Sequence, residues 1–139
     1  MRVITLGTFD IPHWGHFNLL NKCKEMANEV VIGLNTDEFI TMYKGKPPVM
    51  TYKEREQSLN SLGIAGWIIP NDQVSGSAKE VILLSKANYI VIGSDWGRKD
   101  YLSQLGLDWD WLDENNIGLI YINYTKGVST TELKKRLCK

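Results

Sequence analysis

The chain has 139 residues, of which 43% are hydrophobic and 23% charged, a balance typical of one globular domain with a sizeable core. Lysine and arginine together number 16, as do aspartate and glutamate, so the net charge is zero. Proteins that bind nucleic acid or membrane surfaces through charge usually carry a basic excess, so the composition argues against both functions. We expect a single domain over residues 1–139, without a membrane-inserted segment.

Cysteine usage and the N-terminal sequence indicate the compartment. The two cysteines, Cys23 and Cys138, lie far apart and lack the spacing of metal ligands. Two such thiols are typical of a reducing compartment rather than of a disulfide framework. The apolar run at residues 3–6 is too short for a signal peptide, and we therefore expect a cytoplasmic protein.

Short apolar runs alternate with amphipathic stretches along the chain. The runs are rich in valine and isoleucine, as buried parallel strands are, and cover residues 3–6, 30–34, 67–69, 89–92 and 119–122. Helical patterns cover residues 19–27, 77–86 and 129–138, and a capping box at residues 51–54 opens another helix that ends near Gly63. This order predicts an α/β fold, a Rossmann-like parallel sheet of about five strands with helices on both faces.

Four polar or glycine-rich segments follow the predicted strands. They are residues 7–15, 35–46, 93–99 and 123–131. Open parallel sheets bind ligands at the carboxyl ends of their strands, so these four loops are expected to converge on one site.

The first of these loops holds both histidines of the chain. Gly7 allows a tight turn, and Pro12 suits the start of a helix, where its missing N–H costs nothing. His13 and His16 are three residues apart, so on the first helical turn they share a face. A helix N-terminus attracts anions, and two imidazoles there can donate hydrogen bonds to phosphate oxygens. A metal pair is the alternative, but helical metal-binding histidines are more often four apart and no third ligand is evident.

These segments resemble a known family. Residues 7–16, GTFDIPHWGH, resemble the HxGH signature of the nucleotidyltransferase superfamily. Residues 124–131, YTKGVSTT, stand where the cytidylyltransferase branch carries an RTEGISTT-like motif, and residues 92–96 (IGSDW) and 44–46 (KGK) match that branch too. The four motifs occur in the family's order over nearly the whole length. The chain is therefore identified as a member of the cytidylyltransferase family.

The resemblance implies a role for particular residues. His13, His16 and Lys44 are implied to be catalytic, contacting the triphosphate as charge spreads over the phosphoryl oxygens. Arg55 and Lys46 are implied to bind the acceptor. The implied nucleotide site consists of Thr8, Phe9, His13, His16, Asp95, Thr125, Gly127, Ser129 and Thr130.

Several of these residues also have a purely structural explanation. Lys44 is at a position where lysines are commonly solvated, and Arg55 follows a capping box where surface ion pairs are common. Asp95 can cap a helix or stabilise a turn, and Ser129 begins a second capping-box pattern. Trp109 and Trp111 fit either core packing or a dimer interface.

The resemblance further implies partners and cofactors. Magnesium is expected to arrive with the nucleotide, because no dense carboxylate cluster suggests a protein metal site. A homodimer is implied by the resemblance alone. The chain departs from the family at Tyr124, which replaces the motif's arginine, and at Lys126, which replaces its glutamate.

These departures leave three readings of the function. The first is a cytidylyltransferase that joins CTP and glycerol 3-phosphate into CDP-glycerol and pyrophosphate. The second is a cytidylyl- or adenylyltransferase of the same fold that acts on another phosphorylated alcohol, a flavin or a sugar phosphate. The third is a nucleotide-binding regulator without catalysis, against which the intact His13 and His16 argue.

Overall fold

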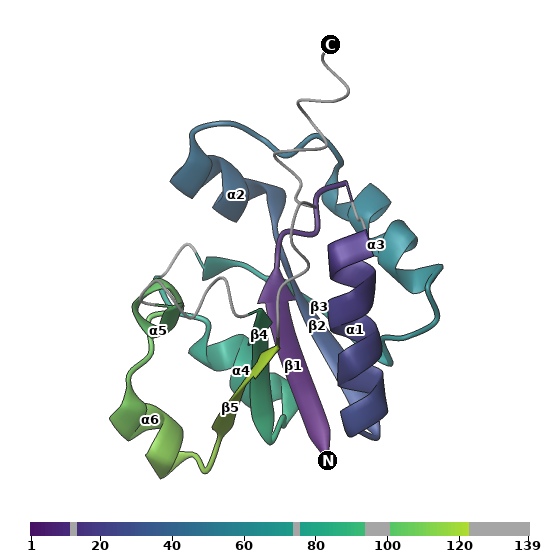
Figure 1. Cartoon of the computed structure of the whole chain (residues 1–139). Helices are drawn as coiled ribbons and strands as arrows, with labels where there is room; N and C mark the ends of the chain where they lie inside the picture. Colours follow the sequence, from purple (N-terminus) through teal and green to yellow (C-terminus); the bar gives the residue numbers. More distant parts are fainter. Residues whose placement is uncertain (12–13, 74–75, 94–100, 123–139) are drawn as a thin grey trace.

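Five parallel strands form one sheet in the order β3-β2-β1-β4-β5 (Figure 1). The structure, a computed structural model, describes residues 1–11, 14–73, 76–93 and 101–122. The strands are β1 (Arg2–Gly7), β2 (Glu29–Asn35), β3 (Trp67–Asn71), β4 (Tyr89–Gly93) and β5 (Gly118–Ile122). All five predicted strands are confirmed, and so is the parallel sheet.

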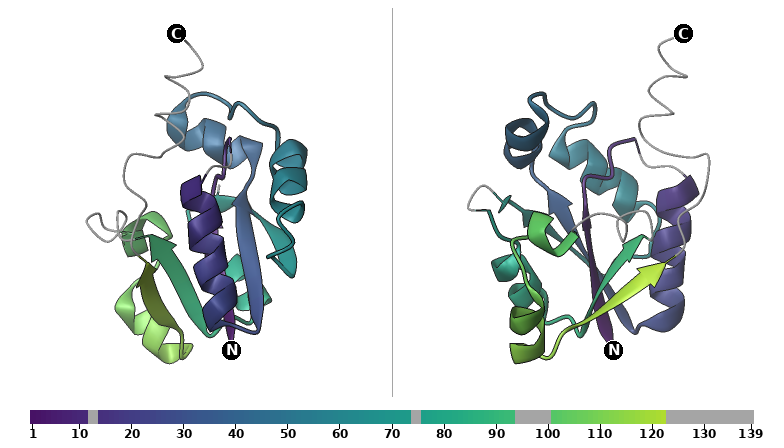
Figure 2. Two further views of the ribbon diagram at one scale, coloured as in Figure 1. Left: turned by 45° about the vertical axis from the view of Figure 1, so that its right-hand side comes forward. Right: turned by 60° about the vertical axis from the view of Figure 1, so that its left-hand side comes forward.

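Helices cover both faces of the sheet, as the alternating pattern predicted. They are α1 (Trp14–Met26), α2 (Asp37–Lys44), α3 (Tyr52–Asn60), α4 (Lys79–Ser85), α5 (Tyr101–Gln104) and α6 (Trp109–Glu114). Figure 2 shows α1 on one face, with α5 and α6 on the opposite side of the sheet. The core clusters agree, because Leu20 of α1 and Leu59 of α3 pack with Ile32, whereas Ile82 of α4 and Leu112 of α6 pack with Ile4.

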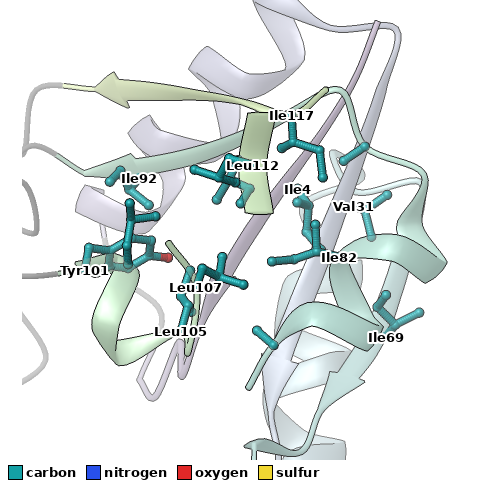
Figure 3. Packing of buried hydrophobic residues seen from close by; sticks show 14 residues of the cluster. Ile4, Val31, Ile69, Ile82, Ile92, Tyr101, Leu105, Leu107, Leu112 and Ile117 are labelled. Atoms are coloured by element: carbon teal, nitrogen blue, oxygen red, sulfur yellow. The ribbon is translucent and has the colours of Figure 1, made fainter. Parts of the chain in front are cut away.

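The core follows the alternation of side chains along each strand. On β1, Val3 belongs to the cluster beneath α1 and Ile4 to the cluster on the other face, and both are fully buried. Figure 3 shows the second cluster, in which Tyr101 lies beside Ile92 and Ile82 lies beside Ile4. Burial of apolar surface on both faces makes the sheet a rigid support for the loops at its carboxyl edge.

The segment after β2 differs from the sequence prediction. Residues 35–46 were predicted to be a loop, but Asp37–Lys44 form the helix α2. Thr36 caps this helix by accepting a hydrogen bond from the Phe39 amide at 3.2 Å, and Ile40 anchors it in the core. Gly45, at a φ of 77°, ends it in the left-handed conformation that glycine adopts freely. The prediction failed because only one buried side chain marks the apolar face of so short a helix.

The sheet opens between β1 and β4. The chain runs outward from β1 to β3 and then returns to β4, so β1 and β4 flank the topological switch point. β1 pairs with β2 along six residues but with β4 at only two, Val3 with Tyr89 and Ile4 with Ile90. The strands therefore separate toward their carboxyl ends, where such folds bind ligands.

Two further features bear on the sequence predictions. Cys23 is a free, fully buried thiol, and burial raises its pKa to about 12. Such a thiol is inert packing rather than a reactive group. No helix in the described ranges is long and apolar enough to cross a membrane. The helix predicted at residues 129–138 lies outside the described residues.

Candidate active site

A pocket of about 560 Å³ occupies the carboxyl edge of the sheet. Residues at the ends of all five strands line it, including Gly7 of β1, Gly93 of β4 and Ile122 of β5. Helices contribute His16 from α1 and Lys44 from α2. The volume is in the usual range for small-molecule sites. The prediction that the loops after the strands share one site is confirmed for those that the structure describes.

The loop after β1 has an unusual backbone. Phe9 and Ile11 have positive φ angles of 50° and 51°, a conformation uncommon for any residue but glycine and a clear outlier for β-branched isoleucine. Phe9 is buried and packs with Leu20 and Ile32. A Cβ on Gly7 would lie 3.0 Å from the Phe9 ring, so glycine is needed there for close approach. Strained backbone conformations of this kind are frequent at functional sites, where contacts with the surrounding structure maintain them.

Buried polar contacts hold this strained loop. The Asp10 carboxylate accepts hydrogen bonds from the Val49 and Met50 amides, both at 2.9 Å, and is only 2% exposed. It thereby ties the histidine loop to the segment between α2 and α3. The sequence did not indicate this role of Asp10, because an aspartate close to the start of a helix is equally compatible with a local cap.

Arg55 supports the same loop from beneath. Its side chain has no exposed surface, and its Nη1 donates at 2.8 Å to the carbonyls of Thr8 and Asn35. Nε donates to the Met50 carbonyl at 3.1 Å, and Nη2 donates to Asp37 Oδ1 at 2.6 Å. This corrects the expectation that Arg55 faces the acceptor phosphate, since each nitrogen is already engaged inside the protein. A buried arginine joins three loop segments here because its planar fork can donate in several directions at once.

His16 lies in the first turn of α1 and lines the pocket. Its ring is tilted by 59° against the Phe9 ring, with centroids 5.0 Å apart. This contact fixes the imidazole at the helix N-terminus, where backbone amides favour a phosphate. The predicted positions of Thr8, Phe9 and His16 around one pocket are thus confirmed as placements.

Lys44 reaches the pocket from the last turn of α2. It is exposed, and its Nζ lies 5.8 Å from the centroid of the Tyr43 ring. Tyr43 and Thr8 share a hydrogen bond of 3.0 Å between their hydroxyls, which brings the end of α2 to the histidine loop. Lys46 is exposed too, but it is not among the described residues that line the pocket.

The remaining predicted site residues cannot be compared with the structure. His13, Asp95, Thr125, Gly127, Ser129 and Thr130 lie outside the described residues, as do Tyr124 and Lys126. Their roles stay predictions.

The pocket also contains groups that sequence reasoning missed. Asn35, Asn71 and Gln73 place three buried amide side chains on the pocket lining. Tyr101 lines it as well, and burial raises the pKa of its phenol, which therefore stays neutral and cannot serve as a base. The one sequence signal for the amides was the asparagine that follows two of the apolar runs, at residues 35 and 71.

Comparisons with known proteins agree with this geometry. Residues 4–136 match the model of the family described as cytidylyltransferase-like. The chain belongs to the cytidylyltransferase-like family. It is 32% identical to the glycerol-3-phosphate cytidylyltransferase of Staphylococcus aureus (strain NCTC 8325 / PS 47) over 137 residues, which covers 98% of this chain and 94% of that protein.

A second relative and a solved structure extend the comparison. The glycerol-3-phosphate cytidylyltransferase of Bacillus subtilis (strain 168) is 31% identical over 137 residues, covering 98% of this chain and 96% of the relative. Among solved structures, the lipopolysaccharide core biosynthesis protein of Thermoplasma volcanium GSS1 superposes with a TM-score of 0.68 at 21% identity, covering 91% of this chain and 98% of that one. At that identity the likeness shows the shared fold alone. The Rossmann-like fold and the membership of a cytidylyltransferase family are thus established.

Proposed function

We propose that this protein transfers CMP from CTP to glycerol 3-phosphate, giving CDP-glycerol and pyrophosphate. The observation that carries the proposal is the position of His16, in the first turn of α1 and against the pocket at the switch point of the sheet. The names of the relatives that match nearly the whole chain support this donor and acceptor.

The proposed reaction is a direct displacement at phosphorus. A phosphate oxygen of glycerol 3-phosphate attacks the α-phosphorus of CTP, and the bond from that phosphorus to the bridging oxygen breaks as pyrophosphate leaves. The protein forms no covalent intermediate, so its contribution is positioning and charge stabilisation. His16 and His13 donate hydrogen bonds to the phosphoryl oxygens, and the amides of the first turn of α1 add their dipole. Lys44 supplies a mobile positive charge to the phosphates.

Magnesium belongs to this proposal as a companion of the nucleotide. Within the described ranges, no cluster of three or more His, Cys, Asp or Glu side chains could hold a metal ion. Among the described residues that line the pocket the acidic one is Asp10, and both of its carboxylate oxygens accept hydrogen bonds from backbone amides. Magnesium readily keeps water and phosphate oxygens as ligands, so an ion bound to the triphosphate fits this lining better than a protein-held ion. Bound there, it would neutralise phosphate charge.

The nucleotide preference provides a test that does not depend on the acceptor. A ligand that binds only the folded state raises the free energy of unfolding by mass action, by about 2.7 kcal/mol at a hundredfold excess over Kd. With magnesium present, CTP is therefore expected to raise the melting temperature by several degrees more than ATP, GTP or UTP at the same concentration. Differential scanning fluorimetry measures this shift. A larger shift with ATP would favour the second reading, an adenylyltransferase.

We also propose that the protein is a cytoplasmic homodimer, an expectation that rests on the family resemblance. Light scattering at micromolar concentration checks the oligomeric state. A mass equal to that of a single 15.8 kDa chain would contradict the dimer.

A further inference from the structure

A row of side-chain amides crosses the floor of the pocket. Asn35 ends β2, Asn71 ends β3, and Gln73 follows two residues later. They are 8%, 1% and 4% exposed, and all three belong to the pocket lining. Buried amides stabilise a fold less than apolar side chains would at the same positions, so this row indicates a functional role rather than a contribution to stability.

Hydrogen bonds fix the orientation of every amide in this row. Gln73 Nε2 donates to the Gln104 carbonyl at 2.7 Å, and Asn35 Nδ2 donates to Thr8 Oγ1 at 3.1 Å. The Gln104 carbonyl can only accept, so the Gln73 oxygen turns toward Asn71, whose Nδ2 donates to it at 3.1 Å and to the Asn35 oxygen at 2.8 Å. Flipping the Asn71 amide would place its oxygen against two other oxygens. Its neighbours thus dictate which way Asn71 points.

This arrangement leaves one buried acceptor without a donor. Within the described part of the chain, Asn71 Oδ1 has no hydrogen-bond partner. A buried carbonyl in that state costs free energy, and such groups in a folded protein call for an explanation. Asn71 lines the pocket, so a small outward shift of its side chain would bring this oxygen to a ligand hydroxyl, which would donate to it and remove the cost. A phosphate or carboxylate oxygen carries no proton to donate, so the position discriminates against an anionic group.

The location favours the acceptor over the nucleotide. In the sheet, β2 and β3 lie on one side of β1 and β4 lies on the other. Lys44 is on the β2 side too, because it ends α2, the helix that follows β2. The phosphates are expected at the N-terminus of α1, over the opening between β1 and β4. The amide row therefore lies on the flank where the alcohol portion of a phosphorylated acceptor would extend.

We propose that Asn71 determines acceptor specificity, by accepting a hydrogen bond from a hydroxyl of the phosphorylated alcohol while Asn35 and Gln73 hold its amide in place. This inference rests on the proposed function and adds the chemical feature that the site selects, a neutral hydroxyl remote from the phosphate.

The test compares glycerol 3-phosphate with propyl phosphate, which keeps the phosphate and the three carbons but lacks both hydroxyls. For the wild type with CTP, kcat/KM for glycerol 3-phosphate is expected to exceed that for propyl phosphate by about 100-fold or more, because a site built around a hydroxyl rejects the analogue without it. In Asn71→Leu the ratio should fall at least tenfold, mainly through a higher KM for glycerol 3-phosphate, with the KM for CTP within about twofold of the wild-type value. The matched control, Asn60→Leu on the exposed end of α3, should keep the wild-type ratio.

The acceptor ratio is internal to each variant, so partial misfolding does not alter it. If Asn71→Leu yields no folded protein, the smaller and polar substitution Asn71→Ser gives the same comparison. Equal losses of kcat/KM with both acceptors would show that the amide row is merely structural. A change confined to the KM for CTP would assign the row to the nucleotide. Either result would overturn this inference and leave the proposed function standing. A wild type that forms no CDP-glycerol overturns the proposed function and this inference together.

Discussion

Replacing His16 by alanine is expected to lower kcat at least about 10²-fold while the protein remains folded. His16 stands at the N-terminus of α1 against the pocket, where charge develops on the phosphoryl oxygens. A preorganised donor at such a point is worth about 3 kcal/mol of transition-state stabilisation. The same loss is expected for His13→Ala, whose role follows from the HxGH resemblance. Steady-state pyrophosphate release with CTP and glycerol 3-phosphate measures both variants.

The control for these variants is Lys24→Ala, which changes an exposed residue of the same helix. It should leave kcat within about twofold of wild type. The melting temperatures of all three variants should stay close to the wild-type value, so that lost turnover reflects lost chemistry. If either histidine variant turned over at a near-normal rate, that histidine would have no part in the mechanism.

Replacing Arg55 by methionine is expected to destabilise the fold by about 3–5 kcal/mol, because removal of one partner from a buried charged network leaves the others unsatisfied. Methionine fills much of the volume but donates to none of the carbonyls of Thr8, Asn35 and Met50. Asp37 would also lose the guanidinium that it accepts from. Chemical denaturation, with the midpoint and slope fitted together, gives the change in unfolding free energy.

Lys53→Met on the same helix is the matched control, since Lys53 is exposed. It should change the free energy of unfolding by no more than about 0.5 kcal/mol. An Arg55→Met protein with wild-type stability and a raised KM for the acceptor would contradict the structural role and restore the role that the family resemblance implied.

The sheet was predictable from sequence because its strands are buried on both faces. Runs such as residues 30–34 and 89–92 are continuous and rich in valine and isoleucine. This pattern is typical of a parallel strand that is buried on both faces, whereas an amphipathic helix alternates apolar and polar residues. The carboxyl edge followed from the strand order, and the histidine motif located the site on it. The short helices were not predictable, because α2, α5 and α6 have too few turns to show a period.

The contacts within the site were out of reach for another reason. The sequence placed Arg55 beside a capping box, where exposed ion pairs are common, and gave no sign that its side chain folds inward beneath Thr8. The amides of Asn35 and Asn71 are 36 residues apart in the chain and 2.8 Å apart in the fold. Only the register between β2 and β3, which pairs these two residues, brings them together.

Identification of the product is the decisive experiment for the proposed CMP transfer. The protein is incubated with magnesium, glycerol 3-phosphate and each of the four ribonucleoside triphosphates in turn, and the mixtures are analysed by phosphorus NMR and mass spectrometry. With CTP we expect CDP-glycerol and pyrophosphate in equal amounts, and with ATP, GTP or UTP little or no conjugate. Absence of CDP-glycerol, or faster formation of a conjugate from another nucleotide, would contradict the proposed CMP transfer.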